Sequence, residues 1–283
     1  PLEKAENVTF PAARIVDYPR FGYRGTMLDC ARHYFKMSFI KEFIDMLALH
    51  NVNTFHWHLT EDQGWRAQID RYPKLTEVGS KRAQTVIGRM TGLFDETPYG
   101  GYYTKDEMRE VVKYAADRYI TVIPEIDMPG HMLGALAAYP ELGCTGGPYK
   151  VAEQWGVFPD ILCAGNPKTY EFVNNVLDEI VDIFPSKYIH IGGDEAPRDR
   201  WKTCPRCQAE IKRLGLKGSN GFPAEAQLQA YFMNQAAKHL AEKGRNIIGW
   251  DEILEGDVDK GTTVMSWRGV NGGIEAAKRG LDA

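Results

Sequence analysis

The feature that most constrains the fold is a repeated alternation of short apolar stretches with longer amphipathic ones. The apolar stretches have the length and composition of buried strands, and they cover residues 23–29, 53–59, 120–126, 188–191, 246–250 and 263–267. Between most of them, apolar side chains recur at helical spacing. This alternation predicts an α/β fold in which a parallel sheet is covered by helices.

The predicted helices fill most connections between these strands. They cover residues 38–50, 104–118, 169–184 and 224–243, with a short last helix at 273–279. Thr104 and Glu107 have the spacing of a capping box, and Gly244 is a natural helix stop. We expect no full helix between the fifth and sixth strands. The long segment between the second strand and Tyr103, rich in Pro and Gly, is expected to carry functional loops.

Polar side chains gather directly after the predicted strands. They are Asp29, residues 58–62, residues 125–131, the pair Asp194 and Glu195, and the pair Asp251 and Glu252. Chemistry at the carboxyl ends of many strands is typical of a (β/α)8 TIM barrel. No Gly-rich phosphate loop follows the first strand, which argues against a nucleotide-binding sheet. A closed barrel needs eight strands and six are visible, so either two strands go unrecognised in the pattern or the chain is cut short.

The composition excludes some classes of function. The chain has 43% hydrophobic and 25% charged residues, as an ordinary globular protein does. Its net charge is −4 and its Lys and Arg residues are spread along the chain, so we expect no nucleic-acid partner. No apolar run approaches the roughly 18 residues that cross a bilayer, so we expect no membrane insertion.

The sharpest local motif is Gly192-Gly193-Asp194-Glu195. Two glycines allow a tight turn as the fourth strand ends, and two adjacent carboxylates in a pocket raise the pKa of at least one of them. A glutamate with a raised pKa suits general acid catalysis. The alternative is a solvated acidic turn that caps the next helix.

Adjacent carboxylates do not fit the usual arrangement for cleaving a glycosidic bond. Most glycosidases place two carboxyl groups about 5–10 Å apart, on opposite sides of that bond. In the substrate-assisted exception the acetamido oxygen of the sugar attacks instead. One carboxylate then protonates the leaving oxygen and its neighbour orients the acetamido nitrogen, a division of labour that tandem Asp194 and Glu195 fit.

His56 and His58 support a rival interpretation. Residues two apart in a strand share a face, so both imidazoles can bind one metal ion. That pattern would suggest a metal-dependent amidohydrolase, with His131 and His190 as the candidates for further ligands. The alternative is that these histidines form hydrogen bonds in the barrel core or the pocket wall.

Other side chains have both functional and structural interpretations. His131 follows the third strand and can reach a carboxylate on the fourth, or it can simply start a helix. Trp250 and Trp267 end strands and can form apolar walls for a sugar, or they can be core residues. Arg24 starts the first strand, where its guanidinium can donate two hydrogen bonds to sugar hydroxyls or pair with a buried carboxylate.

Five cysteines are present. Cys144 and Cys163 flank a loop and can form a disulfide in an oxidising compartment. Cys204 and Cys207 form a lone CxxC motif, for which zinc binding would require two more ligands nearby. From the sequence, a structural pair or free thiols are favoured over a metal or redox site. The fifth cysteine is Cys30.

Six segments together resemble glycoside hydrolase family 20, the β-N-acetylhexosaminidases. They are residues 24–29 (RGTMLD), 58–66 (HLTEDQGWR), 124–131 (PEIDMPGH), 190–195 (HIGGDE), 249–252 (GWDE) and 266–268 (SWR). They occur in the family's order and span nearly the whole chain from Tyr23 onward. Any one alone is suggestive, whereas six in order are highly specific.

The resemblance implies a role for each site residue. It implies that Glu195 is the general acid and then the base, that Asp194 holds the acetamido group, and that His131 with Asp62 tunes Glu195. In the substrate site it implies Arg24 on the sugar hydroxyls, Trp250 and Trp267 in the acetamido pocket, and Asp127 in support. It implies no metal and no organic cofactor.

The resemblance also sets expectations for the whole protein. The activity would be exo-acting removal of terminal β-linked N-acetylhexosamines, whose usual occurrence suggests a periplasmic, secreted or lysosome-like location. Residues 1–20 would lead in from an upstream domain, and residues 21–283 would form the catalytic barrel, incomplete at its carboxyl end. An inactive sugar-binding protein on the same fold is the main alternative. We expect an open six-stranded piece on its own to be poorly stable and weakly active.

Overall fold

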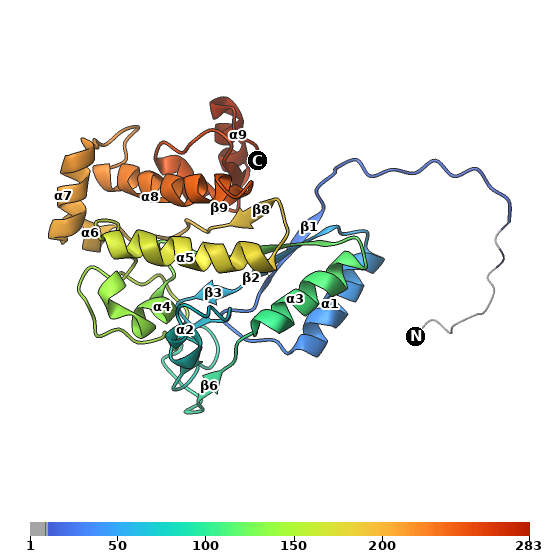
Figure 1. The fold of residues 1–283 in the computed structure, drawn as a ribbon, viewed down its shortest axis with the longest axis horizontal. Coiled ribbons are helices and arrows are strands. Elements are labelled where there is room, and N and C mark those ends of the chain that lie inside the picture. Colours follow the sequence, from blue (N-terminus) through green and yellow to red (C-terminus); the bar gives the residue numbers. More distant parts are fainter. Residues whose placement is uncertain (1–8, 10) are drawn as a thin grey trace.

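The computed structural model describes residue 9 and residues 11–283, and its centre is a six-stranded parallel sheet (Figure 1). The strands are β1 (Gly25–Asp29), β2 (Thr54–His58), β7 (Thr121–Glu125), β8 (Tyr188–His190), β9 (Asn246–Trp250) and β10 (Thr263–Met265). They lie in the order β1-β2-β7-β8-β9-β10, each parallel to its neighbour. All six predicted strands are therefore confirmed.

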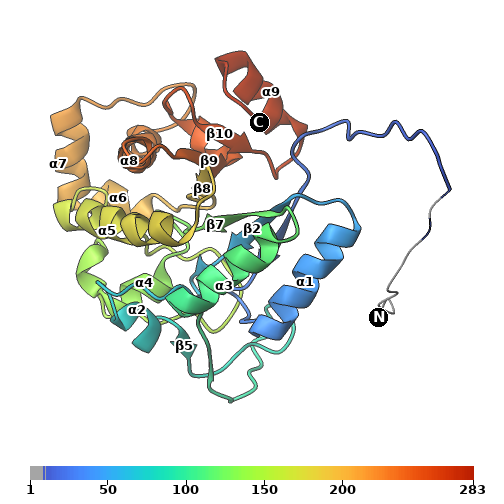
Figure 2. The ribbon, with the colours of Figure 1, turned by 45° about the vertical axis from the view of Figure 1, so that its right-hand side comes forward.

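The long helices pack on the outside of this sheet. They are α1 (Met37–Leu49), α3 (Lys105–Ala116), α5 (Pro167–Ile183) and α8 (Ala224–Ala241), followed by the shorter α9 (Val270–Arg279). Figure 2 shows the first four following one another around the sheet, and each contacts the next. One strand and then one outer helix is the repeating unit of a TIM barrel.

Local sequence signals fix several helix ends. The Thr104 side chain accepts a hydrogen bond from the Glu107 N–H, and the Glu107 carboxylate accepts one from the Thr104 N–H, so the predicted capping box is confirmed. Asn166 caps α5 by accepting from the Lys168 N–H. Helix α8 ends at Ala241, and Gly244 follows with a φ of +70° that favours glycine.

The connections after the strands carry short elements. These are β3 (Thr60–Glu61), β4 (Gly64–Trp65), α2 (Lys74–Glu77), β5 (Lys81–Arg82), β6 (Tyr99–Gly100), α4 (Leu133–Ala138), η1 (Pro140–Leu142), α6 (Asp199–Thr203), α7 (Pro205–Leu214) and η2 (Asp251–Glu255). Most are too short for a helical period to appear in the sequence. The single 3-10 turn η2 confirms that no full helix joins the fifth and sixth strands.

The sheet is an open arc of a TIM barrel. Every residue of the central strand β2 is buried, whereas the edge strand β1 is partly exposed. Within residues 11–283, β1 and β10 each have one strand neighbour and do not pair with each other. An apolar hollow of about 930 Å³ lies against β10, lined by residues such as Tyr23, Val264 and Ile274.

The segment before β1 stands apart from this arc. Residues 11–20 form no helix or strand, and all of them are exposed. The predicted lead-in over residues 1–20 thus falls partly outside the described residues. None of the described helices is long and apolar enough to cross a bilayer.

Candidate active site

The acidic turn after β8 is held in place by glycine and by Asp127. Gly192 and Gly193 have φ values of +67° and +101°, which favour glycine. A Cβ on Gly192 would lie 1.7 Å from Asp127 Oδ1, so no other residue fits there without rearrangement. The Gly193 N–H donates to the same Asp127 oxygen at 3.2 Å. The turn therefore delivers Asp194 and Glu195 to the carboxyl end of the sheet, as the sequence predicts.

His131 connects this turn to the loop after β2. Its Nδ1 lies 2.9 Å from Asp62 Oδ2 and 3.0 Å from Glu61 Oε2. Its Nε2 lies 3.4 Å from Glu195 Oε2 and 3.5 Å from Asp194 Oδ2. The structure thus brings together the four side chains predicted to be catalytic, and it adds Glu61 to them.

His131 and Glu195, whose side chains face each other, both have an unusual backbone conformation. His131 has a φ of +51° and Glu195 a φ of +43°, a region that residues other than glycine rarely adopt. Backbone strain of this kind persists only where the surroundings enforce it, and it clusters at functional sites. Here it turns the imidazole and the carboxylate toward each other.

The titratable groups of this cluster differ in how readily they ionise. Burial of His131 opposes its protonation, but Glu61 and Asp62 raise its pKa far above the ordinary value. Burial raises the pKa of Asp194, and burial together with the nearby Asp194 raises that of Asp127 well above its ordinary range. One of the two adjacent carboxylates therefore has a raised pKa, as expected.

That carboxylate is Asp194, which corrects the expectation for Glu195. The interaction with His131 lowers the pKa of Glu195. The Glu195 side chain is 37% exposed, so desolvation opposes ionisation less than it does at Asp194, whose side chain is 16% exposed. A sugar placed over Glu195 would remove this exposure and raise its pKa.

Arg24 does not lie at the site, contrary to the expectation. It precedes β1, at the amino end of the sheet, where its Nε donates to the Asn51 carbonyl at 2.7 Å and its Nη1 to the Phe21 carbonyl at 2.8 Å. The guanidinium at the carboxyl end is that of Arg32, which pairs with Glu61 at 2.5 Å and with Asp29 at 2.9 Å. Arg32 was not among the predicted site residues, although it follows β1 as the other site residues follow their strands.

The two tryptophans occupy different surroundings. Trp267 is half exposed, and its Nε1–H donates to the Glu252 carboxylate at 2.9 Å. Together with Glu195 and Glu252 it lines a hollow of about 450 Å³. Trp250 lies further inside, where its Nε1–H donates to Glu125 Oε1 at 2.8 Å and its ring lies 4.7 Å from that of His190. Trp267 is thus placed as a pocket wall, whereas Trp250 also belongs to the barrel interior.

Three of the four histidines behind the rival metal interpretation converge on one buried carboxylate. His56 Nε2 and His58 Nδ1 lie 2.7 Å and 2.5 Å from Glu125 Oε2. His190 Nδ1 lies 3.1 Å from Glu125 Oε1. The two strand histidines do share a face, as expected, and together with His190 they form a hydrogen-bonded core around Glu125. Several His and carboxylate groups in this region are close enough to share a cation.

The cysteines take an arrangement that the sequence did not reveal. The Cys144–Cys163 disulfide that the sequence allows is not formed, since all five cysteines are free, the other alternative left open. Instead, the sulfurs of Cys144, Cys163, Cys204 and Cys207 lie within 4.8 Å of one another. The CxxC motif therefore has two further thiols beside it.

An open TIM barrel with clustered carboxylates and a histidine at its strand ends defines the chain as a domain of the barrel glycoside hydrolase class. A model of glycosyl hydrolase family 20, catalytic domain, matches residues 21–283. The chain belongs to this family.

Relatives and solved structures agree with this assignment. The chain is 50% identical over 275 residues to a β-hexosaminidase from Porphyromonas gingivalis, covering 97% of this chain and 34% of that protein. It resembles the crystal structure of a β-N-acetylhexosaminidase from Bacteroides fragilis, with a TM-score of 0.80, 40% identity, and coverage of 94% of this chain and 50% of the other.

A further solved structure is the family 20 exo-β-N-acetylglucosaminidase from Vibrio harveyi, in complex with N-acetylglucosamine. Its TM-score is 0.81 at 38% identity, and the match covers 95% of this chain and 41% of the other. The chain thus spans between about a third and a half of the length of these three proteins.

Proposed function

We propose that the protein is an exo-acting β-N-acetylhexosaminidase that hydrolyses terminal, non-reducing, β-linked N-acetylglucosamine or N-acetylgalactosamine with retention. The observation that carries this proposal is the convergence of Asp194 and Glu195 on one nitrogen of His131, at 3.5 and 3.4 Å. Because both carboxylates reach one imidazole nitrogen, they can act together on one bound sugar, Glu195 at the leaving oxygen and Asp194 at the acetamido group. The names of the similar proteins, which include an exo-β-N-acetylglucosaminidase, support the same activity.

In the proposed mechanism the substrate supplies its own nucleophile. The acetamido carbonyl oxygen attacks the anomeric carbon, the bond to the leaving oxygen breaks, and Glu195 donates a proton to that oxygen. Asp194 accepts a hydrogen bond from the acetamido N–H and stabilises the positive charge of the oxazolinium-like intermediate. Water then attacks the anomeric carbon, the bond from that carbon to the acetamido oxygen breaks, and Glu195 accepts the proton of the water, so the product keeps the β configuration.

The remaining residues of the cluster control the proton on Glu195. His131 is held by Asp62 and Glu61, so its position and its charge are both fixed. Its positive charge keeps Glu195 ionised in the free protein and supports the base step. When a sugar displaces water, Glu195 loses solvation and its pKa rises, so it can carry the proton that the acid step requires.

The sugar itself would bind in the hollow next to Glu195. Trp267 and Trp250 supply apolar surfaces for the acetamido methyl group and the ring. Arg198 and Arg268 line this hollow, and we assign the hydroxyl-binding role expected of Arg24 to Arg32, which pairs with Glu61 beside His131. Asp127 supports the site by fixing the glycine turn.

The test compares a substrate that carries the acetamido group with one that lacks it. We expect full-length protein to cleave an aryl β-N-acetylglucosaminide and to leave the matching aryl β-glucoside intact. Glu195→Gln should lose far more activity on a disaccharide than on a dinitrophenyl glycoside, whose leaving group needs no acid. Asp194→Ala should lose activity on both.

Two results would contradict the proposal. Equal cleavage of the glucoside would exclude a role for the acetamido group. Binding of N-acetylglucosamine without any cleavage would favour an inactive sugar-binding protein instead. The family match and the histidine core both disfavour the metal-dependent amidohydrolase, for which hydrolysis of amides in place of glycosides would be required.

The proposed substrate bears on the location and the domain organisation. Terminal N-acetylhexosamines occur mostly outside the cytoplasm, so we propose a periplasmic, secreted or lysosome-like location. We also propose that residues 21–283 act as the catalytic barrel region and that residues 1–20 lead into it. Fractionation of the producing cells, with activity followed in each fraction, tests the location.

A further inference from the structure

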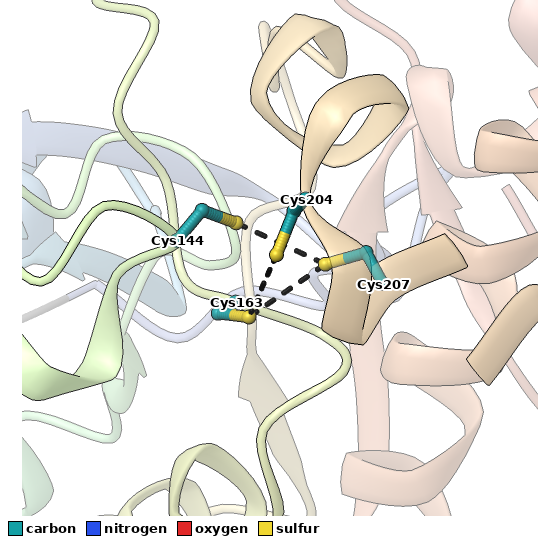
Figure 3. A group of neighbouring side chains, drawn as sticks. All are labelled: Cys144, Cys163, Cys204 and Cys207. Carbon is teal, nitrogen blue, oxygen red and sulfur yellow. Dashed lines mark hydrogen bonds between the residues drawn. The ribbon is translucent and has the colours of Figure 1, made fainter. Parts of the chain in front are cut away.

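Four cysteine thiols converge on one point beside the barrel. Cys144 and Cys163 bound the loop between η1 and α5, whereas Cys204 and Cys207 lie at the start of α7. Figure 3 shows the four side chains directed toward a common centre. The Sγ–Sγ distances are 3.8 Å for Cys144–Cys207, 3.8 Å for Cys163–Cys204 and 3.6 Å for Cys163–Cys207.

These distances fit a tetrahedral tetrathiolate site. Zinc binds thiolate sulfur at about 2.3 Å, which places the sulfurs of a regular tetrahedron about 3.8 Å apart. A disulfide would require a separation of about 2.05 Å. Two packed thiols can also lie at such distances, but four sulfurs that are all within 4.8 Å of one another enclose a centre. Tetrahedral sulfur sites of this kind are typical of zinc.

The backbone around the thiols is built for close approach. Cys204 and Cys207 have the CxxC spacing common in zinc sites, with Pro205 at the first position of α7. A Cβ on Gly165 would lie 2.2 Å from the Arg206 carbonyl carbon, so only glycine lets the loop pack against the CxxC turn. Gly165 also offers its backbone N–H to the sulfurs of Cys163 and Cys207.

The surroundings also suit a negatively charged cluster. Four thiolates around one Zn²⁺ carry a net charge of −2. The Arg206 guanidinium lies beside the cluster, where it donates to the Gly143 carbonyl at 2.9 Å. Cys204 is the N-cap of the ten-residue helix α7, whose dipole favours negative charge at this end. Cys163, Cys204 and Cys207 are buried, and Cys144 is half-buried and leaves an entry path.

We propose that Cys144, Cys163, Cys204 and Cys207 bind one structural Zn²⁺ ion. Binding displaces the thiol protons, so one Zn²⁺ and four thiols give one tetrathiolate complex and four protons, with no redox change. The ion joins the loop after η1 to the segment that follows Asp194 and Glu195. It therefore fixes the outer wall of the site without contacting the substrate, and it does not depend on the proposed activity.

The first test is the metal content of the full-length protein after expression with zinc and desalting. We expect about one zinc ion per chain when the metal content is measured by inductively coupled plasma mass spectrometry. Titration with an organomercurial should release that zinc to a chromogenic chelator at about four thiols per ion. Zinc-free protein with these four thiols reduced would overturn the proposal, as would iron in place of zinc or two disulfides in the intact mass.

Matched cysteine variants locate the site. Cys163→Ser and Cys204→Ser should each lose most of the bound zinc. Cys30→Ser is the control, because Cys30 is buried elsewhere and accepts a hydrogen bond from Trp57 at 3.1 Å. It should keep the full zinc content. Equal zinc in all three variants, or loss in Cys30→Ser alone, would place the metal elsewhere and overturn the assignment.

A spectroscopic measurement covers the case in which the variants fail to fold. Protein with Co²⁺ in place of zinc should show the strong visible absorption of tetrahedral cobalt and a thiolate-to-metal charge-transfer band in the near ultraviolet. A weak octahedral spectrum without the charge-transfer band would show binding by oxygen and nitrogen ligands, which the proposal excludes.

Discussion

Two carboxylate clusters lie at the carboxyl ends of the same strands, yet their hydrogen bonding differs. Both oxygens of Glu125 have hydrogen-bond partners, Oε2 with His56 and His58 and Oε1 with Trp250. Around the outer turn, Asp194 Oδ1 and Asp127 Oδ2 are buried and have no hydrogen-bond partner among the described residues.

This difference separates a structural carboxylate from reactive ones. A buried carboxylate whose two oxygens are both hydrogen-bonded by the protein holds the barrel together and needs no donor from a substrate. A buried carboxylate oxygen without a partner is costly, and such groups call for an explanation in a native fold. Under the proposed function, the acetamido N–H of the substrate would supply the donor that Asp194 lacks. We call Asp127, Asp194 and Glu195 with His131 the outer cluster, and Glu125 with His56, His58 and His190 the inner cluster. The comparison predicts that substitutions in the outer cluster reduce activity and that substitutions in the inner cluster reduce stability.

The largest expected effect is on catalysis in the outer cluster. Asp194→Asn keeps the size of the side chain but removes the negative charge that stabilises the oxazolinium-like intermediate. We expect kcat/KM to fall by about 10²–10⁴-fold. The midpoint of thermal unfolding should not fall, because a buried charge is removed. A variant that unfolds earlier and keeps its activity would reverse the roles of the two clusters.

The next effect is on stability in the inner cluster. Although burial opposes both charges, Glu125 raises the pKa of His58, and its histidine neighbours hold the pKa of Glu125 well below its ordinary value. Glu125→Gln removes the nearer carboxylate partner of the buried His58 charge and leaves only Glu61, at 3.4 Å, so we expect a loss of about 3–5 kcal/mol at neutral pH. Urea unfolding of parent and variant measures it.

The stabilisation contributed by Glu125 depends on pH, and the sign of that dependence follows from the lowered pKa of Glu125. The stabilisation is present above the ordinary value of 4.5 and is lost as the pH falls toward the folded pKa. The difference between parent and Gln variant should therefore shrink as the pH drops below about 4.5. A difference that grows on acidification would mean that Glu125 is protonated at neutral pH.

A smaller effect is the acid limb of the activity profile. Burial raises the pKa of Asp194 above its ordinary value of 3.8, and the mechanism needs its carboxylate ionised. In the free protein kcat/KM should therefore fall with decreasing pH at a midpoint above 3.8. Activity regained on return to neutral pH controls for unfolding. A limb at or below that value would show that Asp194 is solvated or not required.

The sequence predicted the strands and the outer turn because both depend on local patterns. Strand–helix alternation and the two glycines before Asp194 are visible within a few residues. The Glu125 core and the four-cysteine cluster were not predictable, because they depend on which distant loops meet. Cys144 and Cys207, for example, are 63 residues apart and come together only through the packing of α7 on the loop after η1.

Arg24 shows an avoidable error of a different kind. The rule that selected the other site residues is that chemistry lies after a strand, at its carboxyl end. Arg24 precedes β1 and so lies at the amino end, whereas Arg32 follows β1 and meets Glu61. Applied to the direction of the first strand, the same rule selects Arg32 from the sequence alone.

The smallest expected effect tests this placement. Arg24→Ala removes hydrogen bonds to the Asn51 and Phe21 carbonyls far from the carboxyl ends of the strands, so kcat/KM should change by less than about twofold. Arg32→Ala leaves the buried Glu61 beside His131 without its partner, and kcat/KM should fall by at least about tenfold. Kinetics on an aryl β-N-acetylglucosaminide compare the two variants. A loss at Arg24 that equals the loss at Arg32 would mean that both ends of β1 contribute to the site, and the separation of the barrel into a catalytic and a structural end would fail.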